Sequence, residues 1–199
     1  EGFDNFYLVQ GDALDMNLDE LIAEKLGAPH RCKVVANLPY YITTPLVMHF
    51  LEQGFSIDRI VIMVQKEVAE RFAAQPGKKD YGAITVSLNY YGSVRNAFIV
   101  PRHMFVPQPD VDSAVVDIKP WVEKPIIVQD EELFHKVVKA AFGQRRKTLN
   151  NALKVLGYDN AVVQQAMQQC EIDGARRGET LSVAEFAALS DAIKNLTEE

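Results

Sequence analysis

Short apolar runs alternate with helix-like segments in the first part of the chain. Three runs rich in Val, Ile and Leu predict buried strands, at residues 6–12, 33–37 and 59–65. The segments between them, LDELIAEKLG and TPLVMHFLEQG, have helical periodicity, and each closes with a glycine. Because strands alternate with helices in this way in parallel sheets covered on both faces, the pattern predicts βαβ units.

The pattern changes after a third helix-like segment, QKEVAERFAAQPG, which Pro76 and Gly77 end. From Ala83 onward two long β-rich stretches follow, ITVSLNYYGSVRNAFIVP and SAVVDIKPW, with the turn-rich interval RHMFVPQPDVD between them. Strands that follow one another without helices predict an antiparallel addition at one edge of the sheet.

Beyond Trp121 the remaining pattern is helical. VEKPIIVQDEE predicts a linker, LFHKVVKAAFGQRRKTLNNALKVLG predicts one long helical stretch ended by Gly157, and AVVQQAMQQC and SVAEFAALSDAIKNL predict further helices. Ser182 and Glu185 have the spacing of a capping box. The sequence therefore predicts an α/β domain at residues 1–122 and a small all-helical domain at 123–199.

Composition and charge narrow the class of protein. The net charge of −6 argues against general attraction to nucleic acid, but residues 133–157 hold six Lys or Arg and no acid, which leaves −12 on the remainder. No apolar run approaches the roughly 18 residues of a membrane span, and residues 1–10 lack a leader pattern. We therefore expect a cytoplasmic protein without membrane association. Cys32, Cys170 and the four histidines show no metal-ligand spacing, so we expect reduced thiols and no metal.

Polar residues follow two of the predicted strands, as GDA at 11–13 and NLPY at 37–40. Parallel sheets bind ligands at the carboxyl ends of their strands. The exocyclic amine of adenine is a weak nucleophile until two fixed acceptors aim its lone pair. The Asn37 side-chain oxygen and a backbone carbonyl within 37–39 can supply these acceptors, and Tyr40 can stack on the base. Such catalysis is chiefly positioning.

A strand-to-helix turn accounts for the same four residues, with Asn37 as a cap and Pro39 at a helix start. From these residues alone that interpretation is favoured. The wider set of motifs changes the balance, because several stretches together closely resemble the KsgA (RsmA) family of ribosomal RNA adenine dimethyltransferases. The motifs are GDAL at 11–14, NLPYYIT at 37–43, MVQKEVAERF at 63–72, FVPQPDVDSAVV at 105–116 and FGQRRKTLNNAL at 142–153.

The resemblance covers nearly the whole chain and implies both a fold and an activity. The implied fold is an α/β, Rossmann-like methyltransferase domain, partial in this chain, followed by a small C-terminal all-helical domain that positions RNA. The implied activity is transfer of methyl groups from S-adenosyl-L-methionine (SAM) to N6 of two adjacent adenines. These adenines lie in the 3′-terminal helix loop of small-subunit (16S) ribosomal RNA. The implied partner is the pre-30S ribosomal particle, and the full-length protein is expected to be a monomer that acts in ribosome biogenesis.

Carried over by position, the resemblance assigns roles around the two strand ends. Asp12 is expected to accept a hydrogen bond from the adenine amine of SAM, and Ala13 and Asn37 to contact the same cofactor. Asn37 and the carbonyl of Leu38 or Pro39 are expected to hold the target amine.

Two aromatic residues and a basic segment complete the expected site. Tyr40 would stack on one face of the target base and Phe105 on the other. FVPQPDVDS is equally typical of an edge loop with Phe105 in the core. A helix opening with basic residues favours anions, although a solvated helix face accounts for the same residues. The expected RNA contacts are Lys79, Arg145, Arg146 and Lys147.

The chain departs from the family pattern at its start. Members of the family carry a glycine-rich G-x-G-x-G turn and an acid for the cofactor ribose upstream of GDAL, and this chain has neither. We therefore expect a truncated chain that binds SAM weakly or not at all, is inactive alone, and has an opened cofactor cleft or self-associates at the exposed sheet flank.

Three alternatives stay open. They are a non-catalytic RNA-binding assembly factor on the same fold, a large-subunit ribosomal RNA adenine methyltransferase of the antibiotic-resistance class, and a DNA adenine methyltransferase. The match in the C-terminal helices favours the small-subunit enzyme over the large-subunit class.

Overall fold

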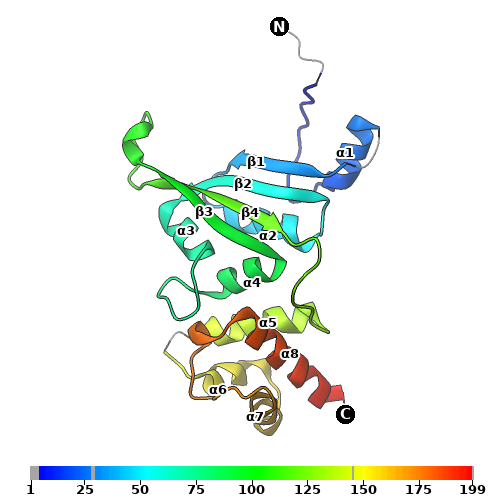
Figure 1. Ribbon diagram of the computed structural model, residues 1–199, viewed down its shortest axis with the longest axis vertical. Coiled ribbons are helices and arrows are strands. Elements are labelled where there is room, and N and C mark those ends of the chain that lie inside the picture. Colours follow the sequence, from blue (N-terminus) through cyan, green and yellow to red (C-terminus); the bar gives the residue numbers. More distant parts are fainter. Residues whose placement is uncertain (1–4, 28–29, 145, 199) are drawn as a thin grey trace. The chain divides into compact units, whose positions relative to one another are not determined.

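The computed structural model describes residues 5–27, 30–144 and 146–198 (Figure 1). The chain separates into two compact units, and neither is one continuous stretch. The first unit contains the residues up to Lys66 together with Asn96–Pro120, and the second contains Glu67–Arg95 and the residues from Trp121 onward. The roles expected of residues 1–122 and 123–199 as separate domains stay a prediction.

A four-stranded sheet in the order β1-β2-β4-β3 carries the candidate site. β1 and β2 are parallel, with Asn37 opposite Met63, whereas β2 and β4 are antiparallel, with Gln65 opposite Ser113. The predicted combination of a parallel pair with an antiparallel addition is thus confirmed. The strands are β1 (Cys32–Asn37), β2 (Ile57–Gln65), β3 (Gly92–Val100) and β4 (Ser113–Pro120).

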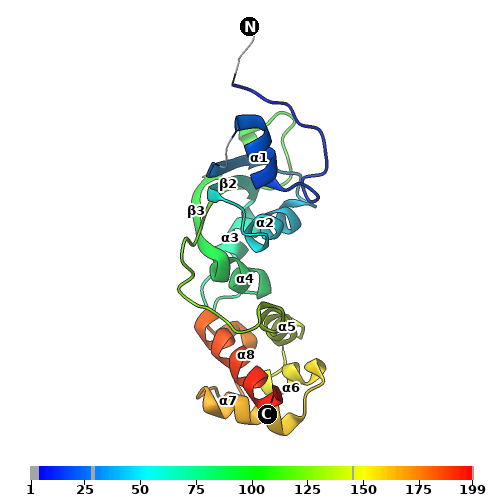
Figure 2. The same ribbon diagram turned by 90° about the vertical axis from the view of Figure 1, so that its right-hand side faces the viewer.

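Two helices accompany the strands of the first unit, α1 (Leu18–Leu26) and α2 (Thr43–Glu52). The Asn17 side chain caps α1 by accepting hydrogen bonds from two backbone N–H groups of the first turn. Figure 2 shows α2 against one face of the sheet. The helix packs in this way because its apolar residues are spaced to form one face. That face buries Leu46, Val47, Phe50 and Leu51.

The second unit is helical, and α5 is at its centre. This helix contacts α4, α6 and α8, and its buried Phe134 and Val137 belong to the core. Figures 1 and 2 both show α5 to α8 side by side. The helices are α3 (Lys66–Phe72), α4 (Ala83–Tyr91), α5 (Glu131–Phe142), α6 (Leu149–Ala152), α7 (Asn160–Gln169) and α8 (Val183–Glu198), with short 3-10 turns η2 (Leu153–Leu156) and η3 (Gly178–Thr180). A further 3-10 turn, η1 (Arg102–Met104), belongs to the first unit.

Hydrogen bonds confirm the predicted capping box at the start of α8. Ser182 Oγ accepts from the Glu185 backbone N–H at 3.2 Å, and a Glu185 carboxylate oxygen accepts from the Ser182 N–H at 2.8 Å. The other Glu185 oxygen pairs with Arg176. These contacts fix the start of α8 to the segment that precedes it.

The second unit also includes a segment from the middle of the chain. Tyr81 donates its hydroxyl to the Leu181 carbonyl at 2.8 Å, and the ring of Tyr90 lies 4.7 Å from that of Phe134 between centroids. Burial, aided by the nearby Glu185 carboxylate, raises the pKa of Tyr81 to about 12. Residues 67–95 therefore complete the core of the C-terminal helices.

Three expectations about the elements were wrong. Residues 83–91 form a helix instead of a strand, since burial on several sides at once outweighs their β-rich composition. Residues 6–10 form no strand, and Leu8 is 86% exposed. An apolar pattern marks a surface that can be buried, but a strand also needs a paired neighbour. The long helical stretch breaks after Phe142, where Gly143 caps α5, and resumes at Leu149.

Candidate functional site

A small hollow of about 180 Å³ lies at the carboxyl end of β1 in the first unit. It brings together three residues that the sequence predicted as a group, Asn37, Tyr40 and Phe105. Both aromatic side chains are accessible at this surface, Tyr40 at 50% exposure and Phe105 half-buried. The full lining consists of Asn37, Tyr40, Met63, Phe105, Pro107, Pro109 and Ser113.

Asn37 is the last residue of β1, and the parallel register sets it beside Met63 of β2. Its side chain is exposed, and the described contacts give it no hydrogen-bond partner within the chain. Asn37 does not cap α2, because the N-cap position of that helix is Ile42. The structure therefore does not support the simple turn interpretation, and the Asn37 amide is available to a ligand.

The two candidate carbonyls after Asn37 differ in their hydrogen bonding. The Pro39 carbonyl accepts from the Ile42 N–H and from the Thr43 hydroxyl, each at 3.1 Å, and so closes the turn that precedes α2. No such bond to the Leu38 carbonyl is described. Because a carbonyl engaged twice is a poor acceptor for a ligand, Leu38 is the better second acceptor for an amine.

Hydrogen bonds at both ends hold the loop that carries Phe105. One Asp112 carboxylate oxygen accepts from the Arg102 N–H at 2.9 Å, and the Arg102 guanidinium donates to the Asp110 carbonyl at 3.1 Å. The Asp112 carbonyl in turn accepts from the Lys66 N–H at 3.0 Å. Phe105 therefore lies in the hollow and not in the core, whereas the next residue, Val106, is 99% exposed.

The chemistry available in this hollow is binding and orientation. Tyr40 is the one lining residue with a titratable ring or acid group, so the described lining offers no carboxylate or imidazole as a general base. Two aromatic surfaces and an amide suit a planar base that carries an amine. No group of three or more metal-ligating side chains occurs within residues 5–27, 30–144 and 146–198.

The expected cofactor residues Asp12 and Ala13 do not line this hollow. One Asp12 oxygen accepts from the Leu14 N–H at 2.9 Å and so stabilises a tight turn before α1. For its other oxygen the described contacts show no partner. Asp12 is exposed and Ala13 is half-buried, so the turn presents a carboxylate to solvent.

The expected RNA contacts lie in the second unit. Lys79 borders a hollow of about 330 Å³ near Glu179, and Arg146 and Lys147 are exposed in the connection between α5 and α6. Arg145 lies outside the described residues. The sequence predicted that a helix N-terminus at these residues would attract phosphate. The helix that follows, α6, has only four residues, so its dipole adds little to this attraction.

Sequence reasoning missed Met63 and Ser113 as lining residues and Asp112 as the anchor of the Phe105 loop. Met63 enters the site through strand pairing with Asn37, and Ser113 through the antiparallel pairing of β4 with β2. If the strands predicted at 33–37 and 59–65 had been assumed to pair in parallel, Met63 would have been found beside Asn37. Nothing local in the sequence distinguishes Asp112 from Asp110.

The fold belongs to the mixed α/β class of Rossmann-like methyltransferase domains. The chain is similar to a dimethyladenosine transferase from Plasmodium falciparum with a TM-score of 0.70 and 22% identity, covering 94% of this chain and 72% of that one. It is also similar to the 23S rRNA methyltransferase ErmE with a TM-score of 0.61 and 21% identity, covering 91% and 80%. At these identities the likeness concerns the fold.

The sequence profile of the ribosomal RNA adenine dimethylase family matches residues 3–195, and the chain belongs to this family. It is 49% identical to ribosomal RNA small subunit methyltransferase A of Clostridioides difficile, over 96% of this chain and 66% of that protein. It is 46% identical to the protein of the same name from Moorella thermoacetica, over 98% and 69%. The chain thus spans about two thirds of the length of these relatives.

Proposed function

We propose that this protein methylates N6 of two adjacent adenines in the 3′-terminal helix loop of small-subunit ribosomal RNA. The observation that carries the proposal is the hollow shared by Asn37, Tyr40 and Phe105, in a chain of the ribosomal RNA adenine dimethylase family. Relatives named as small-subunit methyltransferases support the choice of RNA. An unpaired loop suits the site, because its bases are extruded at low cost.

The proposed mechanism is orientation of the adenine amine. Asn37 Oδ1 accepts one amine hydrogen and the Leu38 carbonyl accepts the other, which draws both out of the ring plane and aims the lone pair. Tyr40 and Phe105 hold the base by stacking. At each transfer the nitrogen gains a methyl group and releases one proton to solvent. After the second transfer no N–H remains, so the product loses both hydrogen bonds to the site.

The methyl donor of this proposal is SAM, which supplies an electrophilic methyl group when bound. Asp12 fits the cofactor's adenine amine, because one carboxylate oxygen is exposed without a described partner while the other fixes the turn. Ala13, next in this turn, and Asn37, at the end of β1, would contact the same molecule. Residues beyond this chain in its longer relatives would be able to add to the cofactor site.

The proposed partner is the pre-30S particle, contacted through exposed basic residues in the connections of the second unit. Lys79, Arg146 and Lys147 are exposed and would meet phosphate, together with Arg145. In this proposal residues 1–122 carry out the transfer, and residues 123–199 position the RNA.

The test compares Asn37→Ala and Asn37→Asp with the parent protein, in a form extended to the length of its relatives. Each protein is incubated with SAM and unmethylated small subunits, and the ribosomal RNA nucleosides are measured by mass spectrometry. We expect Asn37→Ala to lower dimethyladenosine formation at least about 100-fold, as loss of one fixed polar contact in an active site does. Asn37→Asp keeps an acceptor oxygen, so its loss should be smaller.

Binding to the particle, measured in parallel, separates the alternatives. The proposal requires that Asn37→Ala binds the particle within about 3-fold of the parent, a change of under 1 kcal/mol. A parent protein that binds but forms no methylated adenosine would instead be an assembly factor. Methylation of large-subunit RNA or of duplex DNA in place of the small subunit would contradict the proposed substrate.

A further inference from the structure

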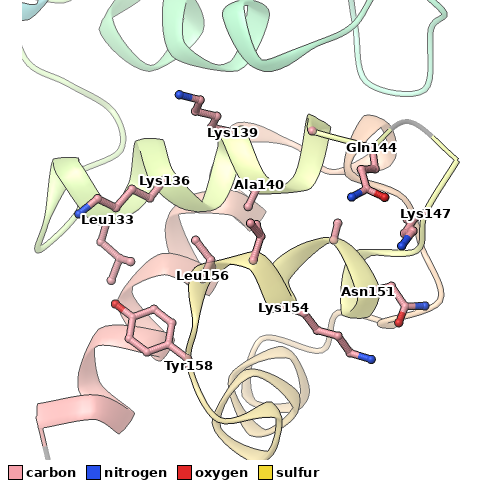
Figure 3. A pocket seen from close by; sticks show the side chains of 13 residues that line it. Leu133, Lys136, Lys139, Ala140, Gln144, Lys147, Asn151, Lys154, Leu156 and Tyr158 are labelled. Atoms are coloured by element: carbon pink, nitrogen blue, oxygen red, sulfur yellow. The ribbon is translucent and has the colours of Figure 1, made fainter.

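A second, larger hollow lies along α5 in the helical unit, and the methyl-transfer proposal does not use it. Its volume is about 850 Å³, and its walls are α5 on one side and α6 with η2 on the other. Figure 3 shows that its two ends differ in chemistry. Gln144, Lys147 and Asn151 lie at one end, and Leu133 and Tyr158 lie at the other beside Lys136, which pairs with Glu132. We call this hollow the α5 groove.

Small side chains keep the α5 groove open. Ala140 of α5 and Ala152 of α6 are both buried, at 8% and 5% exposure, and both line the groove. Larger side chains at these two positions would fill the space between the helices, because protein interiors otherwise pack closely. The floor is therefore apolar, and its shape follows from two alanines that face the same space.

The rim of the α5 groove carries positive charge that the described lining does not neutralise. Lys136 pairs with Glu132 at 2.7 Å. For Lys139, Lys147 and Lys154 no ion pair is described, and no carboxylate lines the groove. Because the chain as a whole has a net charge of −6, this uncompensated cluster is a local exception that attracts anions.

We infer that the α5 groove binds one nucleotide extruded from the ribosomal RNA substrate. Its phosphate lies at the end with Lys147, and its base lies against Tyr158 and Leu133. The inference rests on the proposed function for the identity of the RNA. The volume falls within the about 300–1,000 Å³ of pockets that enclose small molecules. The side-chain amides of Gln144 and Asn151 offer donors and acceptors to the base edge or the ribose.

The two-ended chemistry is the reason to prefer a nucleotide over other anions. Inorganic phosphate or a bare RNA backbone would use the lysines alone and leave the apolar floor in water. An acidic helix would need a longer row of apolar contacts than the few at this floor. A nucleotide matches both ends at once, since it joins a charged phosphate to a flat base that stacks on aromatic side chains.

Such a site would hold unpaired RNA independently of the target adenines. Stacking and phosphate contact tolerate different bases, so we expect modest preference among the four nucleotides. The α5 groove would then help to select an RNA that has a second unpaired nucleotide in addition to the methylated loop.

The first experiment titrates this chain with AMP and, separately, with inorganic phosphate, and follows the methyl signals of Ala140 and Ala152 by NMR. We expect AMP to shift both methyl signals with a millimolar dissociation constant, and phosphate to shift them little. Tyr158→Leu keeps apolar bulk without the aromatic ring, and Lys147→Gln removes one charge. Each should weaken AMP binding about 10-fold, as loss of one stacking or charged contact does. Lys33→Gln, an exposed lysine of the other unit, is the matched control and should leave AMP binding unchanged.

The second experiment adds an RNA hairpin with an unpaired loop to the AMP-bound chain. Displacement of AMP by the hairpin supports the inference, whereas AMP binding without displacement would indicate a site for free nucleotides and overturn it. Equal effects of phosphate and AMP would reduce the groove to an anion surface, and tighter binding of a poly-glutamate peptide would assign it to a protein partner. Both experiments measure binding and neither measures methylation. They therefore test the α5 groove even if the proposed methylation activity proves to be wrong. Asn151→Ala, at an exposed position, replaces Tyr158→Leu if that variant does not fold.

Discussion

Phe105 and its neighbour Val106 show how one residue step separates a ligand-facing side chain from a solvent-facing one. Phe105 lines the hollow with Asn37, whereas Val106 is 99% exposed. The two residues share the same loop and the same hydrogen-bonded anchors. A comparison of the two therefore isolates the contribution of the ring from that of the loop.

We expect Phe105→Ala to weaken methylation and Val106→Ala to leave it near the parent level. Loss of one base-stacking ring costs about 1–3 kcal/mol, or about 5-fold to 150-fold in kcat/KM. Initial rates of methyl incorporation into small subunits measure this directly. Similar losses in both variants would mean that the loop, and not the Phe105 ring, contributes to the reaction.

At this scale the sequence predicted the centre of the candidate site better than its surroundings. Asn37, Tyr40 and Phe105 occur in recognisable motifs, and they share one hollow. Met63 has no motif of its own and enters through the register of β1 and β2. Strand pairing is a long-range property, so a local pattern does not reveal such a residue.

Among the elements, the loop between β3 and β4 depends on one carboxylate. Asp112→Ala removes the acceptor for the Arg102 N–H but keeps the backbone bond from Lys66 to residue 112. We expect the free energy of unfolding to fall by about 1 kcal/mol, the usual net worth of a hydrogen bond. Methylation should fall further, because a small displacement of a positioning group is costly. Thermal unfolding and methylation rates measure the two effects.

Asp110→Ala is the matched control for this loop. Asp110 contributes its backbone carbonyl to the Arg102 guanidinium, and no side-chain bond is described for it. The variant should therefore behave like the parent in both assays. If it lost as much activity as Asp112→Ala, general negative charge near the hollow would explain the result better than the anchor.

Helix α4 shows why local composition can mispredict an element. Residues 83–91 are rich in β-branched and aromatic side chains, yet they form α4, with Val86, Leu88 and Tyr90 buried. Their packing partners come from segments after Trp121, and tertiary burial overrides weak local preference. Local composition therefore predicted α1, α2, β1 and β2 well and failed where distant segments decide the structure.

At the scale of the whole molecule, Glu185 links stability to pH. The hydrogen bond from Arg176 is the main reason that the pKa of Glu185 lies below its ordinary value of 4.5; burial opposes this shift and bonds from Ser182 add to it. A lowered folded-state pKa stabilises the protein above the unfolded value, and this stabilisation is lost as the pH falls through the folded value. The contribution is thus complete above about pH 4.5 and disappears in more acidic solution.

We expect Glu185→Gln to be destabilised relative to the parent at pH 7, and the difference to shrink toward pH 3. Denaturant unfolding at a series of pH values measures it. Glu132→Gln, whose side chain is 79% exposed, should change the unfolding free energy by less than about 0.5 kcal/mol at pH 7. A difference for Glu185→Gln that stayed constant with pH would show that shape, and not charge, matters at this position.

The membership of residues 67–95 in the helical unit has a consequence for synthesis. None of the helices in the described residues is long and apolar enough to cross a membrane. In the folded protein Val86, Leu88 and Tyr90 of this segment are buried. Tyr81 is 100 residues ahead of Leu181, the residue whose carbonyl it meets. At about 5–20 residues per second, a growing chain carries this unfinished core for roughly 5–20 s before its partner emerges. The nascent protein therefore passes through an interval in which chaperones have an apolar surface to bind.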